Sequence, residues 1–324
     1  MKKVLQIVSD VAVTVGCCVG VGFISGKEAQ VFFGNKLNAI IFCFVFFAVN
    51  FAVREYCRKR DCGDIHSLNA SLFKHPTPFD TLIALCSFVC IVTALAGVEE
   101  CIANIVNLGF KLPFFAFFVS FIASLLLYRG MSALKIANVI AVAMSIALLA
   151  VIFATKEEYA VENLQVPFFQ PVIYALFSLT MSLGVVTKLT IGCSKRDNFI
   201  TSLLASLILT LLMLAILASG KFNSPMPILA RIPNKFWLVF ALFTIMLSAI
   251  TGIVANAIPI AQYLYGVIPD KTVCCALIFG FALALSMFGF DFAVKFGYAL
   301  VSIMGGVIFV TTVCKPCSKK VRTM

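Results

Sequence analysis

Charged residues are scarce in this chain, and their scarcity excludes an ordinary soluble protein. Only 12% of the 324 residues are charged and 62% are hydrophobic. A typical soluble domain has about 25% charged and about 45–50% apolar residues. The mean hydropathy is +1.07. The apolar residues fall in segments of about 20 residues, the length of a helix that crosses a bilayer. Because the short alternating runs of barrel strands are absent, the sequence predicts an all-α polytopic membrane protein.

Histidine is nearly absent, and so are the motifs of catalytic and nucleotide-binding sites. The two histidines, His66 and His75, lie in a predicted loop. The chain has no nucleophile elbow, no phosphate-binding loop and no cluster of metal-ligand residues. Most of the 13 cysteines lie within apolar segments, where a free cysteine behaves as a small hydrophobic residue. We therefore expect neither an enzyme, nor an ATP-driven pump, nor a resident cofactor.

Acidic residues are fewer than basic ones, which gives a net charge of +11. Basic residues of membrane proteins gather in cytoplasmic loops, and the chain has no basic runs with interleaved aromatic residues outside its apolar segments. The excess therefore indicates a lipid bilayer as partner and no nucleic acid. It predicts a multi-pass protein of the cell inner (plasma) membrane with both termini cytoplasmic and a basic tail at 315–324. The oligomeric state is not indicated.

The first apolar segment carries a cluster of glycines where an unbroken membrane helix would otherwise form. The four glycines lie within eleven residues: Gly16, Gly20, Gly22 and Gly26. Each costs about 1 kcal/mol relative to alanine inside a helix. We predict two half-helices, at about 4–16 and 24–34, joined by open backbone that faces protein or a watery cavity. A flexible, glycine-rich packing helix is the alternative.

The residues after the glycines predict how the second half-helix begins. Ser25 and Glu28 have the spacing of a capping box, although Glu28 could also face the opening. The start of this half-helix would direct its positive dipole end at the gap and favour an anionic group. Broken helices form the solute sites of many transporters. The predicted solute-binding residues here are Gly20, Gly22, Phe23, Ser25, Gly26 and Glu28.

Ten spans can be placed along the chain, and they divide into two sets of five. The sixth, at about 170–188, contains a small polar patch at 178–184, whose Ser178, Thr180 and Ser182 are also predicted to bind the solute. If this span is interrupted like the first, the two halves form an inverted repeat. Hydroxyl groups that bond to carbonyls of their own helix explain the patch equally well. The expected organisation is one transporter domain over 1–324, with repeat one at about 1–155 and repeat two at about 168–314.

Two further groups of residues are candidates for charge or ion binding. In span three, Glu100 lies on a helical face of small and polar residues, whereas Glu99 falls on the apolar side. We therefore expect the carboxylate of Glu100 to face inward and to act as a proton carrier or cation partner. The alternative is that Glu100 lies at the level of the lipid headgroups. In span eight, Ser248 and Thr251 share one face. Together with opened carbonyls near Gly16 they form a candidate sodium site, although ordinary small-residue packing is the alternative. The expected coupling ion is Na⁺ or H⁺.

The stretch Gly20-Val-Gly-Phe-Ile-Ser-Gly-Lys-Glu-Ala-Gln-Val-Phe-Phe33 resembles the first-span signature of YkvI-type membrane proteins. That signature is commonly Gly-x-Gly-Phe-Ala-Ser/Thr-Gly-x-Glu-x-x-x-Phe-Phe, and Ile24 replaces its usual alanine. The resemblance implies the amino acid–polyamine–organocation superfamily and a LeuT-like fold of five-plus-five inverted repeats with interrupted helices 1 and 6. It implies ion-coupled uptake of a small solute.

The sequence therefore predicts a secondary active transporter for a small solute, an amino acid or related amine, that works by ion-coupled alternating access. The alternative is a membrane sensor or structural protein that keeps the fold without transporting.

Overall fold

The computed structural model describes residues 2–106, 113–154, 165–219, 226–232, 234–288 and 297–315, and all regular structure within these ranges is helical. The basic tail predicted at 315–324 therefore lies almost wholly outside the described residues. Several helices begin at a side chain that accepts a backbone amide; Asn35, for example, accepts the amide of Asn38 at 2.9 Å. The elements are α1 (Lys2–Cys18), α2 (Val21–Ser25), the π-helical turn η1 (Ala29–Phe33), α3 (Lys36–Arg60), α4 (Ile65–Leu72), α5 (Thr77–Val106), α6 (Phe114–Arg129), α7 (Met131–Ala154), α8 (Gln170–Leu189), α9 (Lys195–Ser219), the 3₁₀ turn η2 (Leu229–Arg231), α10 (Lys235–Tyr265), α11 (Lys271–Ser286) and α13 (Tyr298–Cys314).

Six of the described helices are long and apolar enough to cross a membrane: α3, α5, α7, α8, α9 and α10. Three shorter helices, α6, α11 and α13, are also apolar. The molecule thus has the repeated apolar helices of a multi-pass membrane protein. The ten-span layout stays a prediction.

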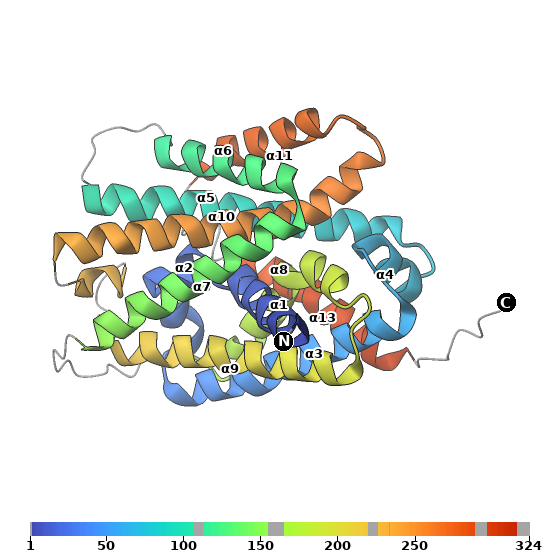
Figure 1. The fold of residues 1–324 in the computed structure, drawn as a ribbon, viewed down its shortest axis with the longest axis horizontal. Helices are drawn as coiled ribbons and strands as arrows, with labels where there is room; N and C mark the ends of the chain where they lie inside the picture. The colour runs from blue at the N-terminus through green and yellow to red at the C-terminus, as the bar shows by residue number, and fades with distance from the viewer. Residues whose placement is uncertain are drawn as a thin grey trace.

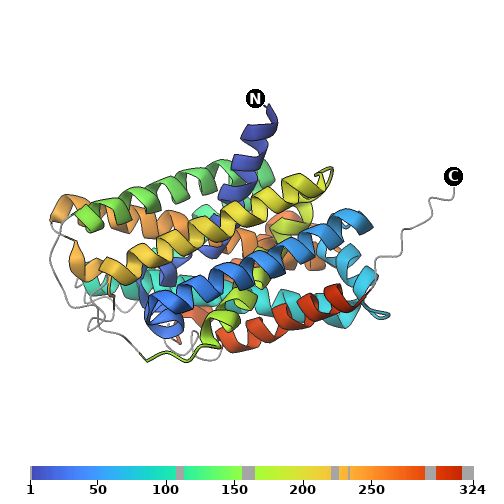
Figure 2. The same ribbon diagram turned by 90° about the horizontal axis from the view of Figure 1, so that it is seen from below.

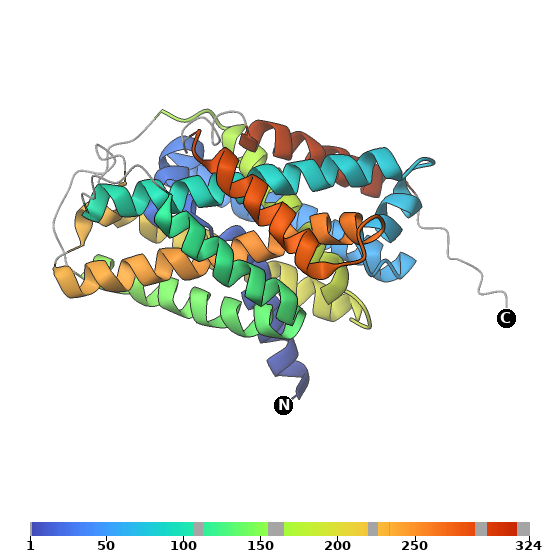
Figure 3. The same cartoon turned by 90° about the horizontal axis from the view of Figure 1, so that it is seen from above.

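The long helices pack in pairs that join distant parts of the chain. The most extensive contacts join α5 to α10, α3 to α9, α8 to α13 and α3 to α8. Figure 1 shows α5 beside α10 and α9 beside α3, with α1 and α8 between these pairs. The first turns of α1 project beyond the rest of the bundle in Figure 2 and Figure 3. The end of α1 and the start of α2 are therefore enclosed by other helices.

A buried polar network fixes α1 against its neighbours. Lys135 Nζ of α7 donates to Asp10 Oδ1 at 3.0 Å, and Arg54 Nη2 of α3 donates to Thr14 Oγ1 at 2.6 Å. Arg54 is only 1% exposed, and its Nε also donates to Asn50 at 2.8 Å. Because unpaired buried charges are costly, these bonds hold the middle of α1 in register with α3 and α7.

The predicted interruption of span six is wrong, because α8 is a continuous helix from Gln170 to Leu189. Its hydroxyl groups bond to carbonyls of their own helix: Ser178 to Tyr174 at 2.8 Å, Thr180 to Leu176 at 3.1 Å and Ser182 to Leu179 at 3.0 Å. Back-bonding satisfies these polar groups without opening the backbone.

Close packing between α8 and α13 depends on Gly305. A methyl group at this position would overlap the carbonyl oxygen of Leu176, whereas one at Gly306 would meet only Leu176 Cδ1 at 3.5 Å. We predict that Gly305→Ala lowers the unfolding free energy by about 1–3 kcal/mol because α8 and α13 must separate. Thermal unfolding of the purified protein in detergent measures this effect. Gly306→Ala is the matched control, and equal melting temperatures for the two variants would contradict the packing described.

Candidate functional site

The first segment opens between α1 and α2. α1 ends at Cys18 and α2 begins at Val21, so Val19 and Gly20 alone separate them. The Gly20 amide donates to the Cys18 carbonyl at 3.2 Å, and Ile24 N then donates to Gly20 O at 3.1 Å. Helical bonding therefore resumes at Gly20, and the opening is shorter than the predicted one from 16 to 24.

The predicted capping box is not formed, because the helix restarts before Ser25. Ser25 is the last residue of α2, where its hydroxyl donates to Gly22 O at 3.2 Å. Gly26 then adopts a left-handed conformation with φ 85° and ends α2. The segment around η2 covers this turn, since Ile228 N donates to Ser25 O at 3.0 Å. Glu28 is consequently not used as a cap.

The carboxylate of Glu28 instead joins the first segment to two distant helices. Tyr174 of α8 donates its hydroxyl to Glu28 Oε2, and Tyr298 of α13 donates to Glu28 Oε1 at 2.6 Å. Glu28 is only 3% exposed, and among the described residues no Lys, Arg or His forms an ion pair with it. Two hydroxyl donors thus replace the water that a charged carboxylate would otherwise bind.

Aromatic rings enclose this carboxylate and exclude water from it. Phe177 stacks on Tyr298 with a centroid separation of 3.9 Å, and Phe32 lies 5.6 Å from the same ring. Phe33 contacts the ring of Tyr174 edge-on at 5.2 Å. Both tyrosine hydroxyls are therefore fixed in direction by packing as well as by hydrogen bonds.

The polar patch of α8 lies directly beside the opening. Cys18 Sγ, at the end of α1, donates to the Ser178 carbonyl at 3.5 Å. By contrast, Thr180 faces α13 and donates to Val301 O at 3.1 Å. Of the three predicted residues on α8, Ser178 thus contacts the first segment through its backbone carbonyl, and Thr180 is directed away from it.

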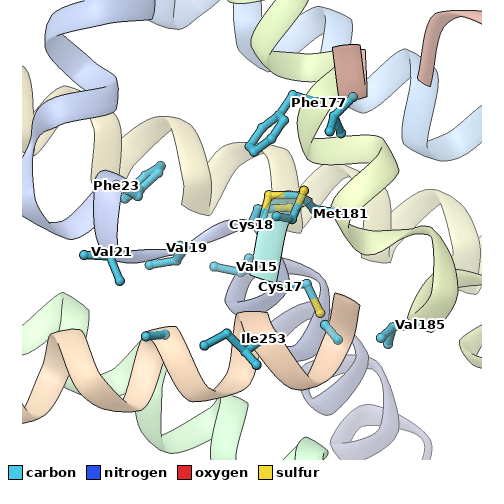
Figure 4. Packing of buried hydrophobic residues seen from close by; sticks show 14 of the residues in the cluster. Val15, Cys17, Cys18, Val19, Val21, Phe23, Phe177, Met181, Val185 and Ile253 are labelled. Carbon is cyan, nitrogen blue, oxygen red and sulfur yellow. The ribbon is translucent and has the colours of Figure 1, made fainter. Parts of the chain in front are cut away.

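The opening is closed in this structure. Figure 4 shows buried apolar side chains from α1, α8 and α10 gathered around it, including Val15, Val19, Met181 and Ile253. Residues 16–26 line none of the cavities of about 620, 490, 250 and 190 Å³ found elsewhere in the molecule. A solute could enter only after these side chains move.

The residues of the candidate sodium site lie on helices that pack together. α1 contacts both α7 and α10. Thr251 Oγ1 donates to Ser248 O at 3.0 Å, whereas Ser248 Oγ is buried without a hydrogen-bond partner among the described residues. Asn138 Oδ1 of α7 is also buried without one, and it lies against Gly16. These oxygen atoms fit the preference of a hard cation for oxygen ligands.

The two glutamates of α5 have different partners. Glu100 Oε1 lies 4.0 Å from Lys27 Nζ, next to the first segment. Glu99 is not simply on an apolar face, because its carboxylate accepts the amides of Phe115 and Ala116 at 3.1 and 3.0 Å. It therefore caps the start of α6, where the helix dipole favours a negative charge.

Comparisons with known proteins show which fold the chain has, but they do not assign it to a family. No protein-family model matches the chain, and no curated protein matches it. The chain is similar to the solved inward-facing structure of Mhp1, a LeuT-fold transporter, with a TM-score of 0.56 and 15% identity over 93% of this chain and 75% of that one. The chain therefore shares the LeuT-type fold. At this identity the likeness extends to the fold alone.

The sequence did not indicate the two tyrosines of the site. Tyr174 and Tyr298 lie 146 and 270 residues from Glu28, so no local spacing relates them to it. A buried tyrosine hydroxyl needs a hydrogen-bond partner, and this rule applies equally to any tyrosine in an apolar span. Only the packing of α8 and α13 against the first segment selects these two.

The carboxylate of Glu28 lies against Gly22 and leaves no room for a side chain at this position. An added Cβ at Gly22 would lie 2.6 Å from Glu28 Oε1, whereas nothing lies within 4 Å of one at Gly20. We predict that Gly22→Ala displaces Glu28 from its tyrosines and lowers the unfolding free energy by about 1–3 kcal/mol. Chemical unfolding in detergent, with Gly20→Ala as the control, tests this. A Gly22→Ala protein as stable as the Gly20→Ala protein would show that Glu28 is not held as described.

Proposed function

We propose that this protein is a secondary transporter that moves a small solute across the cell membrane by alternating access. The observation that carries the proposal is the opening of the first segment at Val19 and Gly20, enclosed at the centre of a LeuT-type fold. Opened helices supply bare backbone groups to solute sites in such transporters. In lipid, an opening is tolerated only where protein or a watery cavity covers it.

Helix packing supports a five-plus-five inverted repeat, with repeat one at about 1–155 and repeat two at about 168–314. An inverted repeat would match the helices of the two halves in order: α1 with α8, α3 with α9, α5 with α10, α6 with α11 and α7 with α13. Each contact should then have a counterpart between the matched helices. The contact of α1 with α7 has its counterpart in α8 with α13, that of α3 with α8 in α9 with α1, and that of α5 with α11 in α10 with α6; all six contacts are present. An odd number of spans in each half gives the two halves opposite orientations, which is the inverted-topology repeat of many secondary transporters. The proposed orientation has both termini in the cytoplasm.

The proposed solute site lies between the opening and α8. Gly20 has free space around it, and Ser178 already contacts the end of α1 through Cys18. Backbone amides and carbonyls at this position suit a solute with both a carboxylate and an amine, which supports an amino acid or a related amine as the solute. A coupling ion, Na⁺ or H⁺, would supply the driving force, and the unpartnered oxygen of Ser248 supports a cation site near Gly16 and Thr251.

A non-transporting protein of the same fold is the second candidate. The observation that favours it is the apolar filling of the opening, since residues 16–26 line none of the four cavities named above. Solute binding to the purified protein separates the two candidates.

We predict that one member of a panel of amino acids and amines raises the melting temperature of the purified protein, in the presence of sodium or potassium. A ligand at 100 times its Kd adds about 2.7 kcal/mol of stability. Gly20→Leu should abolish this rise without unfolding the protein, because the new side chain occupies the free space at the opening.

Gly280→Leu is the matched control, since Gly280 lies on α11 and also has nothing within 4 Å of an added Cβ. This variant should respond to the solute like the unaltered protein. A folded protein that responds to no solute under either ion condition would favour the non-transporting candidate.

A further inference from the structure

Among the described residues, Glu28 differs from the other buried acidic groups in having no basic partner. Asp10 is as buried as Glu28, at 3% exposure, but it accepts a bond from Lys135 at 3.0 Å. Lys27, the neighbour of Glu28 in the chain, is directed to Glu100 at 4.0 Å. A buried carboxylate without a positive partner is costly as an anion, and the cost disappears when it takes up a proton.

The other groups that face Glu28 supply no positive charge. The first segment contributes a thiol at the end of α1, α5 contributes a second thiol, and α8 and α13 contribute one phenol each. They are Cys18, Cys90, Tyr174 and Tyr298. The charge state of the carboxyl is therefore not fixed by a salt bridge on any helix packed against it.

The surroundings of Glu28 suit a proton better than a metal cation. Hard cations take about six or more oxygen ligands, whereas the oxygen partners of this carboxylate among the described residues are two tyrosine hydroxyls, and the rings of Phe32 and Phe177 pack on one of these tyrosines. Each carboxylate oxygen already accepts one hydroxyl bond. A proton needs only one of these oxygens and no additional space.

We propose that Glu28 is a proton-binding site, and that its protonation releases one of the two hydrogen bonds that hold the opened segment to α8 and α13. The proposal rests on the proposed transport function, in which this proton is the coupling ion. It goes beyond the expected role of Glu28 in binding solute, because the carboxyl is satisfied by tyrosines and is separated from the opening by Gly22.

The chemistry of the carboxyl links proton uptake to movement of the helices. An ionised carboxylate accepts from both tyrosines, but a protonated one has an O–H that itself donates. When a proton from solvent adds to one oxygen, that oxygen becomes a weaker acceptor and gains an O–H that needs an acceptor of its own. The tyrosine on that side then either accepts from this O–H or turns away, and in both cases the bond that it donated is lost. The bond to α8 or the bond to α13 is then replaced. Gly22 of α2 lies against the same carboxyl, so the change reaches the opening through α2.

The test is a pH titration of the full-length protein in lipid nanodiscs by infrared difference spectroscopy, with no solute present. A protonated carboxylic acid has a C=O stretching band that the carboxylate lacks. We expect a band equivalent to one carboxyl per protein that appears as the pH falls and disappears as it rises. Glu28→Gln should lose the band. Glu55→Gln should keep it, because Arg58 holds the Glu55 carboxylate at 2.6 and 2.8 Å.

Tyr174→Phe and Tyr298→Phe give a readout that does not depend on removing Glu28. Loss of the tyrosine that still donates to the protonated carboxyl should move the carboxyl band to higher frequency while leaving its intensity at one proton per protein. Absence of a titrating band, or a band at the same frequency in both tyrosine variants and in the unaltered protein, would overturn the proposal.

The same samples distinguish failure of this proposal from failure of the transport function. A titrating Glu28 band together with no solute response in the thermal panel would retain the proton site and reject transport. Solute binding and uptake together with no titrating band would retain transport and reject Glu28 as the proton site.

Discussion

The carboxylate of Glu28 is the constraint on which the centre of this molecule depends. A buried carboxylate needs donors, and here both come from tyrosines on helices that are far from Glu28 in sequence. The bonds therefore fix the first segment, α8 and α13 relative to one another. Because the aromatic rings exclude water, neither hydroxyl can be replaced without rearranging the packing around it.

The glycines of the first segment serve close approach as much as flexibility. Gly16 lies against Asn138 and Gly22 against Glu28, so a side chain at either position would displace a polar group. Gly26 ends α2 in a left-handed conformation that other residues adopt at a cost. Gly20 alone has open space around it. The opening is thus a tightly packed structure with one free position.

The membrane class, the long apolar helices and the opening of the first segment were predictable from composition, segment length and glycine spacing. The continuity of α8 was not, because Ser178 and its neighbours satisfy their hydroxyls within the helix, and sequence alone allows either outcome. The restart of the helix was predicted near residue 24, because Ser25 and Glu28 have the spacing of a capping box. The structure begins α2 at Val21 instead, and the spacing of two residues cannot show whether their side chains form the cap. The tyrosine partners required tertiary packing, since their separation from Glu28 exceeds any helical period.

A double-mutant cycle between Glu28 and Tyr298 tests the central interaction most directly. The cycle uses Glu28→Met, which keeps the length of the side chain without its charge, Tyr298→Phe and the combined variant, each unfolded reversibly in mixed micelles. A hydrogen bond to a buried carboxylate predicts a coupling free energy of about 1–3 kcal/mol. Single effects that add to within about 0.5 kcal/mol would mean that the two side chains do not interact, and would contradict the account.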